Sequence, residues 1–205
     1  MTTRTPMTTT NRLKWTFSGL GLMGLLACSG GGGGTTNNPP PPKTIADRLD
    51  YTNPTSGTYT LVKDTTLSTP THLVLNLMGP VGTQGTGVGF YLSADSSKLT
   101  WSKPSGSDAI LAHNGAFDLG TAPQFAVAKN SGDQLQVGFY QKGTTKPAVT
   151  FTASTVLASV ALDLKSNVPV GSGGNLIAVP NKAVLNQGSG APVPIAITPG
   201  TVTAN

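Results

Sequence analysis

The sequence predicts an all-β fold built from two packed antiparallel sheets. From about residue 56 onward, apolar and polar residues alternate with a period of two, which is typical of strands that bury one face. Stretches rich in glycine, proline, asparagine and serine interrupt this alternation at short intervals, and helical periodicity is almost absent. Many short strands separated by turns favour a β-sandwich.

The alternation is clearest in four stretches, and each of them predicts one strand. In residues 72–78, Leu73, Leu75 and Leu77 share one face, and the intervening residues share the other. The other stretches and their inward residues are 88–94 (Val88, Phe90 and Leu92), 134–140 (Leu135, Val137 and Phe139) and 156–164 (Val156, Ala158, Val160, Leu162 and Leu164).

Turn-forming residues separate the predicted strands. The run Asn130-Ser131-Gly132-Asp133 lies between residues 125–129 and 134–141, so it predicts a β-hairpin. Further strong breakers lie at residues 79–80, 103–106, 171–174 and 199–200.

The first 27 residues have the three parts of an export signal. Arg4, Arg12 and Lys14 form a positive leader without acidic residues, and a short apolar stretch follows over residues 15–26. A spanning helix needs about 20 predominantly apolar residues, so this stretch is too short to cross a bilayer. We therefore expect residues 1–27 to be a cleaved signal peptide.

The signal ends in Leu25-Leu26-Ala27-Cys28, which resembles the lipobox of bacterial lipoproteins. The resemblance implies cleavage before Cys28 and lipid, such as palmitate, on this cysteine, although Leu26 stands where the family usually has a smaller residue. By the same resemblance, Ser29 next to the cysteine implies sorting to the outer membrane. The expected location is the cell envelope, lipid-anchored and facing outward or the periplasm. An ordinary secretory signal or an uncleaved anchor is the alternative.

The residues after the cysteine cannot form a core. Residues 30–34 are all glycine and residues 39–42 are all proline, so a flexible stretch is expected to lead into an extended spacer. The predicted organisation is therefore a signal peptide at 1–27, a lipidated tether at 28–45 and one β-sandwich domain at 46–205.

The composition restricts the chemistry of this domain. Cys28 is the only cysteine, so a lipid on it leaves no disulfide, thiolate metal site or cysteine nucleophile. Charged residues make up 10% of the chain, and its net charge of +5 includes the three basic residues of the leader. Without them, ten basic residues oppose eight acidic ones, a net charge of +2. Because the lysines are also scattered, no nucleic-acid partner is expected.

Residues that catalysis requires are scarce. The only histidines are His72, expected at an exposed or rim position of a strand, and His113, expected in a loop. No Gly-x-Ser-x-Gly motif and no zinc or calcium spacing accompanies them. The aspartates that a glycosidase would need are expected in turns or on outward strand faces: Asp95, Asp118, Asp133 and Asp163. We therefore expect no enzymatic activity, no cofactor and no metal.

Two tyrosines are the candidate binding residues. Tyr91 and Tyr140 alternate with core-directed neighbours, so both are expected to point outward from their strands. An outward aromatic pair could stack on a sugar ring or anchor a protein partner, although single surface tyrosines are also common. Trp101 shares a face with Leu99 and is assigned to the core.

One segment resembles the cohesin family. Residues 89–99, Gly-Phe-Tyr-Leu-Ser-Ala-Asp-Ser-Ser-Lys-Leu, are similar to a cohesin strand that is followed by an aspartate and, four positions later, a leucine. Two positions depart from the pattern, because Ser96 stands where proline is usual and Ala94 where an aromatic residue is frequent. Residues 73–77, 156–164 and 199–203 resemble further strands of the family.

The cohesin resemblance implies a nine-stranded jelly-roll sandwich, related to carbohydrate-binding modules, that binds partners without catalysis. It also implies that Tyr91 and Tyr140 belong to the same sheet. The favoured function is therefore a non-catalytic surface lipoprotein that binds a dockerin-like protein module or a polysaccharide. The alternative is a structural or assembly lipoprotein of the envelope, because low charge and a strand-rich surface favour contacts between sheet edges. A polysaccharide hydrolase is a third, less favoured hypothesis.

Overall fold

The computed structural model describes residues 42–120, 126–141, 146–188 and 190–205. All regular secondary structure in these residues is strand, which confirms the predicted all-β class. Every strand pairing in them is antiparallel except the one between β16 and β2. The predicted signal peptide, the lipidation site Cys28 and most of the predicted tether lie outside the described residues.

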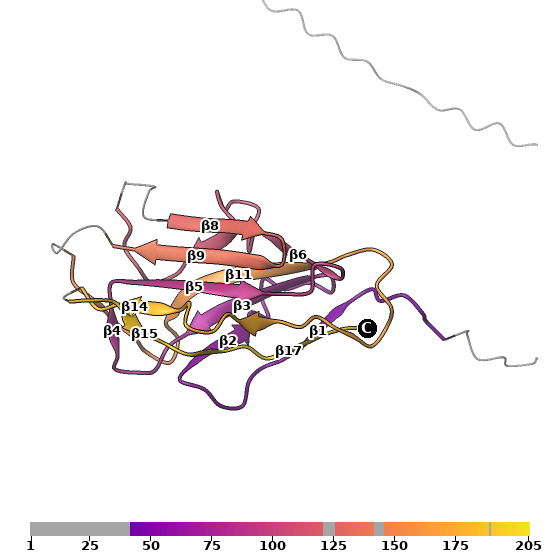
Figure 1. Ribbon diagram of the computed structural model, residues 1–205, viewed down its shortest axis with the longest axis horizontal. Helices are drawn as coiled ribbons and strands as arrows, with labels where there is room; N and C mark the ends of the chain where they lie inside the picture. Colours follow the sequence, from indigo (N-terminus) through magenta and orange to yellow (C-terminus); the bar gives the residue numbers. More distant parts are fainter. Residues whose placement is uncertain (1–41, 121–125, 142–145, 189) are drawn as a thin grey trace, which may run out of the picture. The chain divides into compact units, whose positions relative to one another are not determined.

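Two six-stranded sheets form the layers of the domain (Figure 1). Sheet I has the order β16-β2-β3-β11-β6, with β7 also paired with β11. Its strands are β2 (Tyr59–Lys63), β3 (His72–Met78), β6 (Leu99–Ser102), β7 (Ala112–Asn114), β11 (Val156–Leu164) and β16 (Ile197–Thr198). Sheet II has the order β15-β14-β5-β9-β8, with β13 also paired with β5. Its strands are β5 (Gly87–Ser93), β8 (Ala126–Ser131), β9 (Gln134–Tyr140), β13 (Ile177–Ala178), β14 (Val184–Asn186) and β15 (Val193–Pro194).

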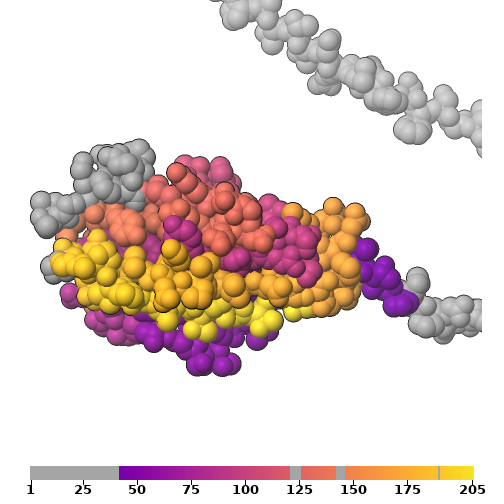
Figure 2. All heavy atoms as spheres, viewed as in Figure 1, coloured from indigo at the N-terminus to yellow at the C-terminus, as the bar shows by residue number. Residues whose placement is uncertain are grey.

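Two smaller sheets complete the domain. One contains β1 (Leu49–Thr52), β17 (Thr201–Ala204) and β12 (Ser172–Gly173), and the other pairs β4 (Gln84–Gly85) with β10 (Val149–Thr150). In the space-filling view, the C-terminal part of the chain, coloured orange to yellow, runs along the length of the domain (Figure 2). β1 near the start of the described chain pairs with β17 at its end, and β2 pairs with β16 in sheet I, so both ends of the described chain meet in the same sheets.

The core lies between sheets I and II and draws on both. Its members include the predicted inward residues of four strands, each at most 2% exposed: Leu73, Leu75, Leu77, Val88, Phe90, Leu92, Leu135, Val137, Phe139, Ala158, Val160 and Leu162. The predicted alternation in these strands is therefore confirmed. Trp101, assigned to the core, is 5% exposed, and its indole Nε1 donates a hydrogen bond to the Asp133 carbonyl oxygen at 3.0 Å.

The inward placement predicted for Val156 is wrong because β11 contains a bulge at its start. The pairing with β3 shifts between Val156 and Ala158, so Leu157 is an extra residue in the strand. Leu157 enters the core, whereas Val156 lines a cleft on the outer face together with Ser159. Period-two alternation cannot reveal a bulge, because the residues on both sides of it are apolar.

The loop predicted for His113 is also wrong, since this residue lies in the short strand β7. β6 pairs with residues 161–164 of β11, and β7 pairs with residues 158–160, so the two short strands cover the same edge in succession. The predicted hairpin is confirmed, because β8 and β9 pair on either side of Gly132 and Asp133. Gly132 has a φ of 59°, which glycine adopts without strain.

Removing a large core side chain should destabilise the whole domain. Phe90 is 1% exposed and lies in β5 at the centre of sheet II, so Phe90→Ala should lower the free energy of unfolding by about 3–5 kcal/mol. Chemical denaturation followed by circular dichroism measures this change. Val81→Ala is the control, because Val81 is 71% exposed and should change stability by less than about 0.5 kcal/mol. A loss below 1 kcal/mol for Phe90→Ala would contradict a core shared by both sheets.

Candidate functional site

Tyr91 and Tyr140 lie on neighbouring strands of sheet II and line the same groove. Tyr91 in β5 is paired with Gln136 in β9, and Tyr140 in β9 is paired with Gly87 in β5. Their inward neighbours Phe90 and Phe139 are buried, so both tyrosines belong to the outer face of the sheet. The groove that they line has a volume of about 290 Å³, and we call it the tyrosine groove.

The ring of Tyr140 lies against a bed of three glycines. A methyl group on Gly89 would come within 2.0 Å of the Tyr140 hydroxyl oxygen, and one on Gly87 within 2.6 Å of its Cδ1. A methyl group on Gly138 would lie 3.1 Å from Cε2 of the same ring. The glycines therefore allow the ring to lie along the sheet, and any larger residue at Gly89 or Gly87 would move it.

This position leaves Tyr140 half-buried and raises the pKa of its phenol. Burial is the main cause of the raised pKa, and the nearby phenol of Tyr91 adds to it. A neutral phenol can both donate and accept a hydrogen bond. The tyrosine side chains therefore give the groove aromatic surface together with hydroxyl groups that can bond to a partner.

The remaining walls of the tyrosine groove combine apolar and polar side chains. Val127 of β8 and Val184 of β14 flank it, and Gln136 and Lys182 supply hydrogen-bond donors. No acidic residue is among the described residues that line it. A partner that offers apolar surface together with carbonyl or carboxylate acceptors would fit this lining.

A second cluster combines serine, histidine and aspartate but has the wrong geometry for a catalytic triad. The Nδ1 atom of His72 lies 2.5 Å from Asp163 Oδ1 and 3.4 Å from Ser102 Oγ. A triad requires the carboxylate on one ring nitrogen and the nucleophile on the other. The His72 side chain is 24% exposed, as expected for a rim position, and it joins β3 to β11 across the sheet.

The remaining candidate carboxylates stabilise turns. Asp95 pairs with the Lys98 ammonium and accepts hydrogen bonds from Ser97, and these contacts, the lysine foremost, lower its pKa to about 2. Asp118 pairs with Lys146, which lowers its pKa. Asp133 lies in the β8–β9 turn. A general acid needs a raised pKa, so neither Asp95 nor Asp118 has the character of a glycosidase acid.

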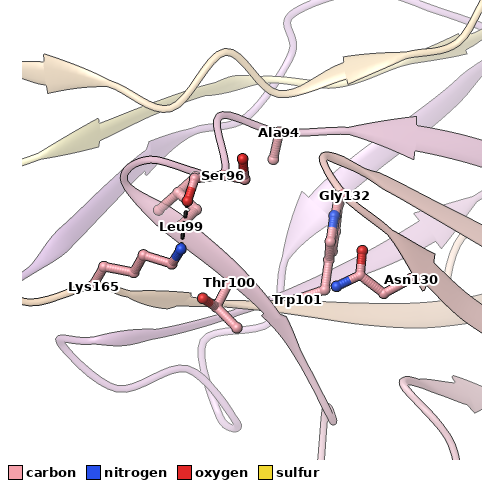
Figure 3. Close-up of a pocket in the computed structure, with 8 residues that line it drawn as sticks. All are labelled: Ala94, Ser96, Leu99, Thr100, Trp101, Asn130, Gly132 and Lys165. Carbon is pink, nitrogen blue, oxygen red and sulfur yellow. Dashed lines mark hydrogen bonds between the residues drawn. The ribbon is translucent and has the colours of Figure 1, made fainter.

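A small hollow near the β8–β9 turn offers little space for a ligand. Figure 3 shows Trp101 and Asn130 side by side, and Lys165 donating to the Ser96 carbonyl oxygen. The volume of about 80 Å³ is far below the roughly 300–1,000 Å³ of typical ligand sites. Among the described residues there is no cluster of three histidine, cysteine or acidic side chains that could hold a metal ion. None of the described segments forms a helix with the length and apolar character needed to cross a membrane.

Comparison with solved structures identifies the fold. The sixth cohesin of scaffoldin B from Acetivibrio cellulolyticus, solved in complex with a mutant Cel5 dockerin, has a TM-score of 0.50 and 19% identity, over 71% of this chain and 97% of that one. The second type II cohesin of the ScaA scaffoldin from the same organism has a TM-score of 0.49 and 14% identity, over 74% and 98%. CaCohA2 from Clostridium acetobutylicum has a TM-score of 0.47 and 12% identity, over 78% and 91%.

The domain is thus a β-sandwich of the cohesin type, as the strand segments predicted. No protein-family model matches the sequence, and no curated protein does. The structure places Tyr91 and Tyr140 on the outer face of one sheet, as the alternation and the cohesin resemblance implied, but the glycine bed beneath Tyr140 was not predicted. The sequence does contain a pattern that indicates the glycine bed. Gly87, Gly89 and Gly138 occupy outward positions of two adjacent strands, where polar residues are usual on a solvent-facing side.

A methyl group at Gly89 should displace Tyr140 without harming the core. In Gly89→Ala the ring must leave the sheet, so the Tyr140 phenol becomes more exposed and its raised pKa should fall toward the ordinary value near 10. In the wild type, the raised pKa of Tyr140 contributes to the free energy of unfolding below pH 10, and this contribution is lost as the pH rises through the pKa of Tyr140 in the folded chain. Because the pKa is raised less in Gly89→Ala, this variant should lose less stability over the same pH range.

An NMR titration of the Tyr140 ring measures this pKa directly. Gly173→Ala is the matched control, because a methyl group on Gly173 would meet no atom within 4 Å. An unchanged pKa in Gly89→Ala would show that Tyr140 does not rest on the glycine bed.

Proposed function

We propose that this chain is a non-catalytic binding module that presents the tyrosine groove to a dockerin-like protein module. The observation that carries the proposal is the pair of tyrosines on adjacent strands, half-buried in one groove of sheet II. Aromatic side chains at the centre of an interface bury a large area with little loss of conformational freedom. The complex of the sixth scaffoldin B cohesin with a dockerin supports a partner of this class.

The sheet provides a rigid platform for such a partner. β5 and β9 pair along seven residues, and the inward residues on both strands are packed in the core. A partner that docks on this face therefore needs little rearrangement of the backbone, which reduces the entropy lost on binding. Lys182 at the wall can pair with a partner carboxylate or carbonyl group, which would set the orientation of the complex.

The proposal also places the module on a lipid anchor in the outer membrane. Its support is the sequence of the first 45 residues: a positive leader, a short apolar stretch, the lipobox ending in Cys28, and a tether of glycine and proline. A lipid on Cys28 would hold the chain at the membrane, and the tether would let the module reach partners in the surrounding space. One acyl chain binds a membrane only marginally, so stable anchoring requires more than one.

Truncating either tyrosine should weaken partner binding. The purified mature chain is tested against a panel of dockerin modules, an envelope extract of the source organism and a glycan array, alongside Tyr91→Ala and Tyr140→Ala. We expect one dockerin-like module to be retained and each substitution to lower its affinity at least tenfold, or about 1.4 kcal/mol.

Val81→Ala should bind like the wild type, because this exposed residue lies outside the tyrosine groove. Retention of a glycan that both tyrosine variants lose would assign the groove to a polysaccharide instead. Partner binding that ignores both substitutions would refute the groove as the binding site.

Replacing the cysteine should abolish the anchor. In Cys28→Ser the thiol that would carry the lipid is absent, so the chain should lose its acyl mass and leave the membrane fraction. Mass spectrometry of the N-terminal peptide and fractionation of cells measure both effects. Ser29→Ala is the control and should keep the lipid. An unmodified Cys28 in the wild type would count against the lipoprotein.

A further inference from the structure

The outer face of sheet I contains a cleft that the proposed function does not use. It has a volume of about 450 Å³, within the range of small-molecule binding sites. Its floor is formed by β3 and β11, and its walls include residues of β7, of the loop before β3 and of the turn before β11. The residues that line it include Asp64, Leu67, Asn76, Asn114, Val156 and Ser159, and we call the site the Asn76 cleft.

A fixed row of polar groups crosses the floor of the Asn76 cleft. Asp64 Oδ1 accepts hydrogen bonds from the backbone N–H groups of Thr66 and Leu67, both at 2.9 Å. Asp64 Oδ2 accepts a hydrogen bond from Asn76 Nδ2 at 3.0 Å, and Asn76 Oδ1 accepts one from Ser159 Oγ at 2.7 Å. The loop backbone at Thr66 and Leu67 thus holds the Asp64 carboxylate, and this carboxylate orients the Asn76 side-chain amide. The row is preorganised before any ligand arrives.

Two members of this row, Asn76 and Ser159, keep unused hydrogen-bonding capacity. The second N–H of Asn76 remains a donor, and the hydroxyl of Ser159 can still accept. Ser159 is only 5% exposed, which is unusual for a serine that points to the outer face of a sheet. Asp64 and Asn76 are half-buried, so a ligand in the cleft can reach the Asn76 amide, while the burial of Ser159 protects its hydrogen bond to Asn76 from competing water.

Two further residues present acceptors. Asn114 donates from Nδ2 to the Phe117 carbonyl oxygen at 2.5 Å, but its buried Oδ1 receives no hydrogen bond from the described residues. His113 Nδ1 lies 2.6 Å from Asp108 Oδ1, so in the neutral ring this nitrogen donates and Nε2 is left as an acceptor. A buried acceptor without a donor costs free energy, but the Asn114 oxygen is closed off from solvent, so the acceptor that faces the cleft is His113 Nε2.

The rest of the lining narrows the ligand class. Leu67, which is 45% exposed, and Val149 and Val156 give the cleft apolar walls. No lysine, arginine, tryptophan, tyrosine or phenylalanine is among the described residues that line it. An anionic ligand would find no cationic partner, and a flat aromatic ligand would find no large ring to stack on. Hydroxyl groups that both donate and accept, carried on a partly apolar ring, match the lining best.

We propose that the Asn76 cleft binds an uncharged saccharide, with sugar hydroxyls hydrogen-bonded to Asn76 and Ser159 and a sugar ring packed against Leu67 and Val156. The site is independent of the proposed function, because it lies on sheet I and the tyrosine groove lies on sheet II. Both outer faces can therefore be occupied at the same time. The chain then joins a protein module on one face to a glycan on the other.

Side-chain amide signals in ¹H–¹⁵N NMR spectra test the cleft directly. The purified mature chain is titrated with cellohexaose, xylohexaose, mannohexaose and chitohexaose, and with hexagalacturonate as a charged comparison. We expect at least one neutral hexasaccharide to shift the Asn76 and Asn114 side-chain amide signals in a saturable way. Hexagalacturonate should bind at least tenfold more weakly, because no lysine or arginine is among the described residues that line the cleft.

Variants separate the cleft from the rest of the surface. Asn76→Ala should lower the affinity for the hexasaccharide at least tenfold, whereas Asn130→Ala, an exposed asparagine on β8, should leave it unchanged. Ser154→Trp fills the mouth from an exposed position that tolerates substitution, so it keeps the test valid if Asn76→Ala does not fold. Tyr91→Ala should not alter saccharide binding, which distinguishes this site from the tyrosine groove.

Four results would overturn the proposal. The first is that no neutral hexasaccharide shifts either amide signal. The second is binding that survives both Asn76→Ala and Ser154→Trp. The third is a preference for hexagalacturonate, which would contradict an uncharged ligand. Loss of saccharide binding in Tyr91→Ala with Asn76→Ala unaffected would assign the sugar to the tyrosine groove and also count against the cleft.

Discussion

The burial of one face of every long strand in a single core determines what the outer faces can display. In a strand, neighbouring side chains point to opposite faces, so the burial of Leu75 forces Asn76 outward, and the burial of Phe90 and Phe139 forces Tyr91 and Tyr140 outward. A slip of one residue in pairing would exchange the two faces and expose the core. Both candidate sites therefore exist because the core fixes the pairing of β3 with β11 and of β5 with β9.

The same constraint explains how much of the structure could be predicted from the sequence. Alternation identified β3, β5, β9 and β11 and their inward residues, because one face of each of these strands packs large apolar side chains into the core. It failed where alternation carries no information: at the bulge beside Val156 and in the three-residue strand that contains His113. The tyrosine pair could be predicted because it needs only the direction of two side chains. The Asn76 cleft could not, since it depends on a loop and two turns brought together from distant parts of the sequence.

The glycine bed weakens sheet II locally and makes room for the ring of Tyr140 in the tyrosine groove. Glycine within a strand is unfavourable by roughly 0.5–1 kcal/mol relative to alanine, so three outward glycines on adjacent strands weaken sheet II locally. The ring of Tyr140 covers this bare backbone and supplies the missing side-chain contacts. Tyr140 therefore has a structural role as well as a position in the groove, and its replacement removes the cover and the binding surface together. Tyr91 is not among the nearest contacts of these glycines, so the Tyr91→Ala variant tests partner binding without uncovering the glycine bed.

The two outer faces differ in chemistry in a way that suits two kinds of partner. The tyrosine groove offers aromatic surface and a lysine, whereas the Asn76 cleft offers amides, hydroxyls, a carboxylate and an imidazole. Because the faces belong to opposite layers of one rigid core, a ligand on one does not occupy the space of a ligand on the other. If both proposed sites are occupied at once, a bound protein and a bound glycan are held at a high local concentration without any conformational change of the domain. The sandwich itself would then be the linker between them.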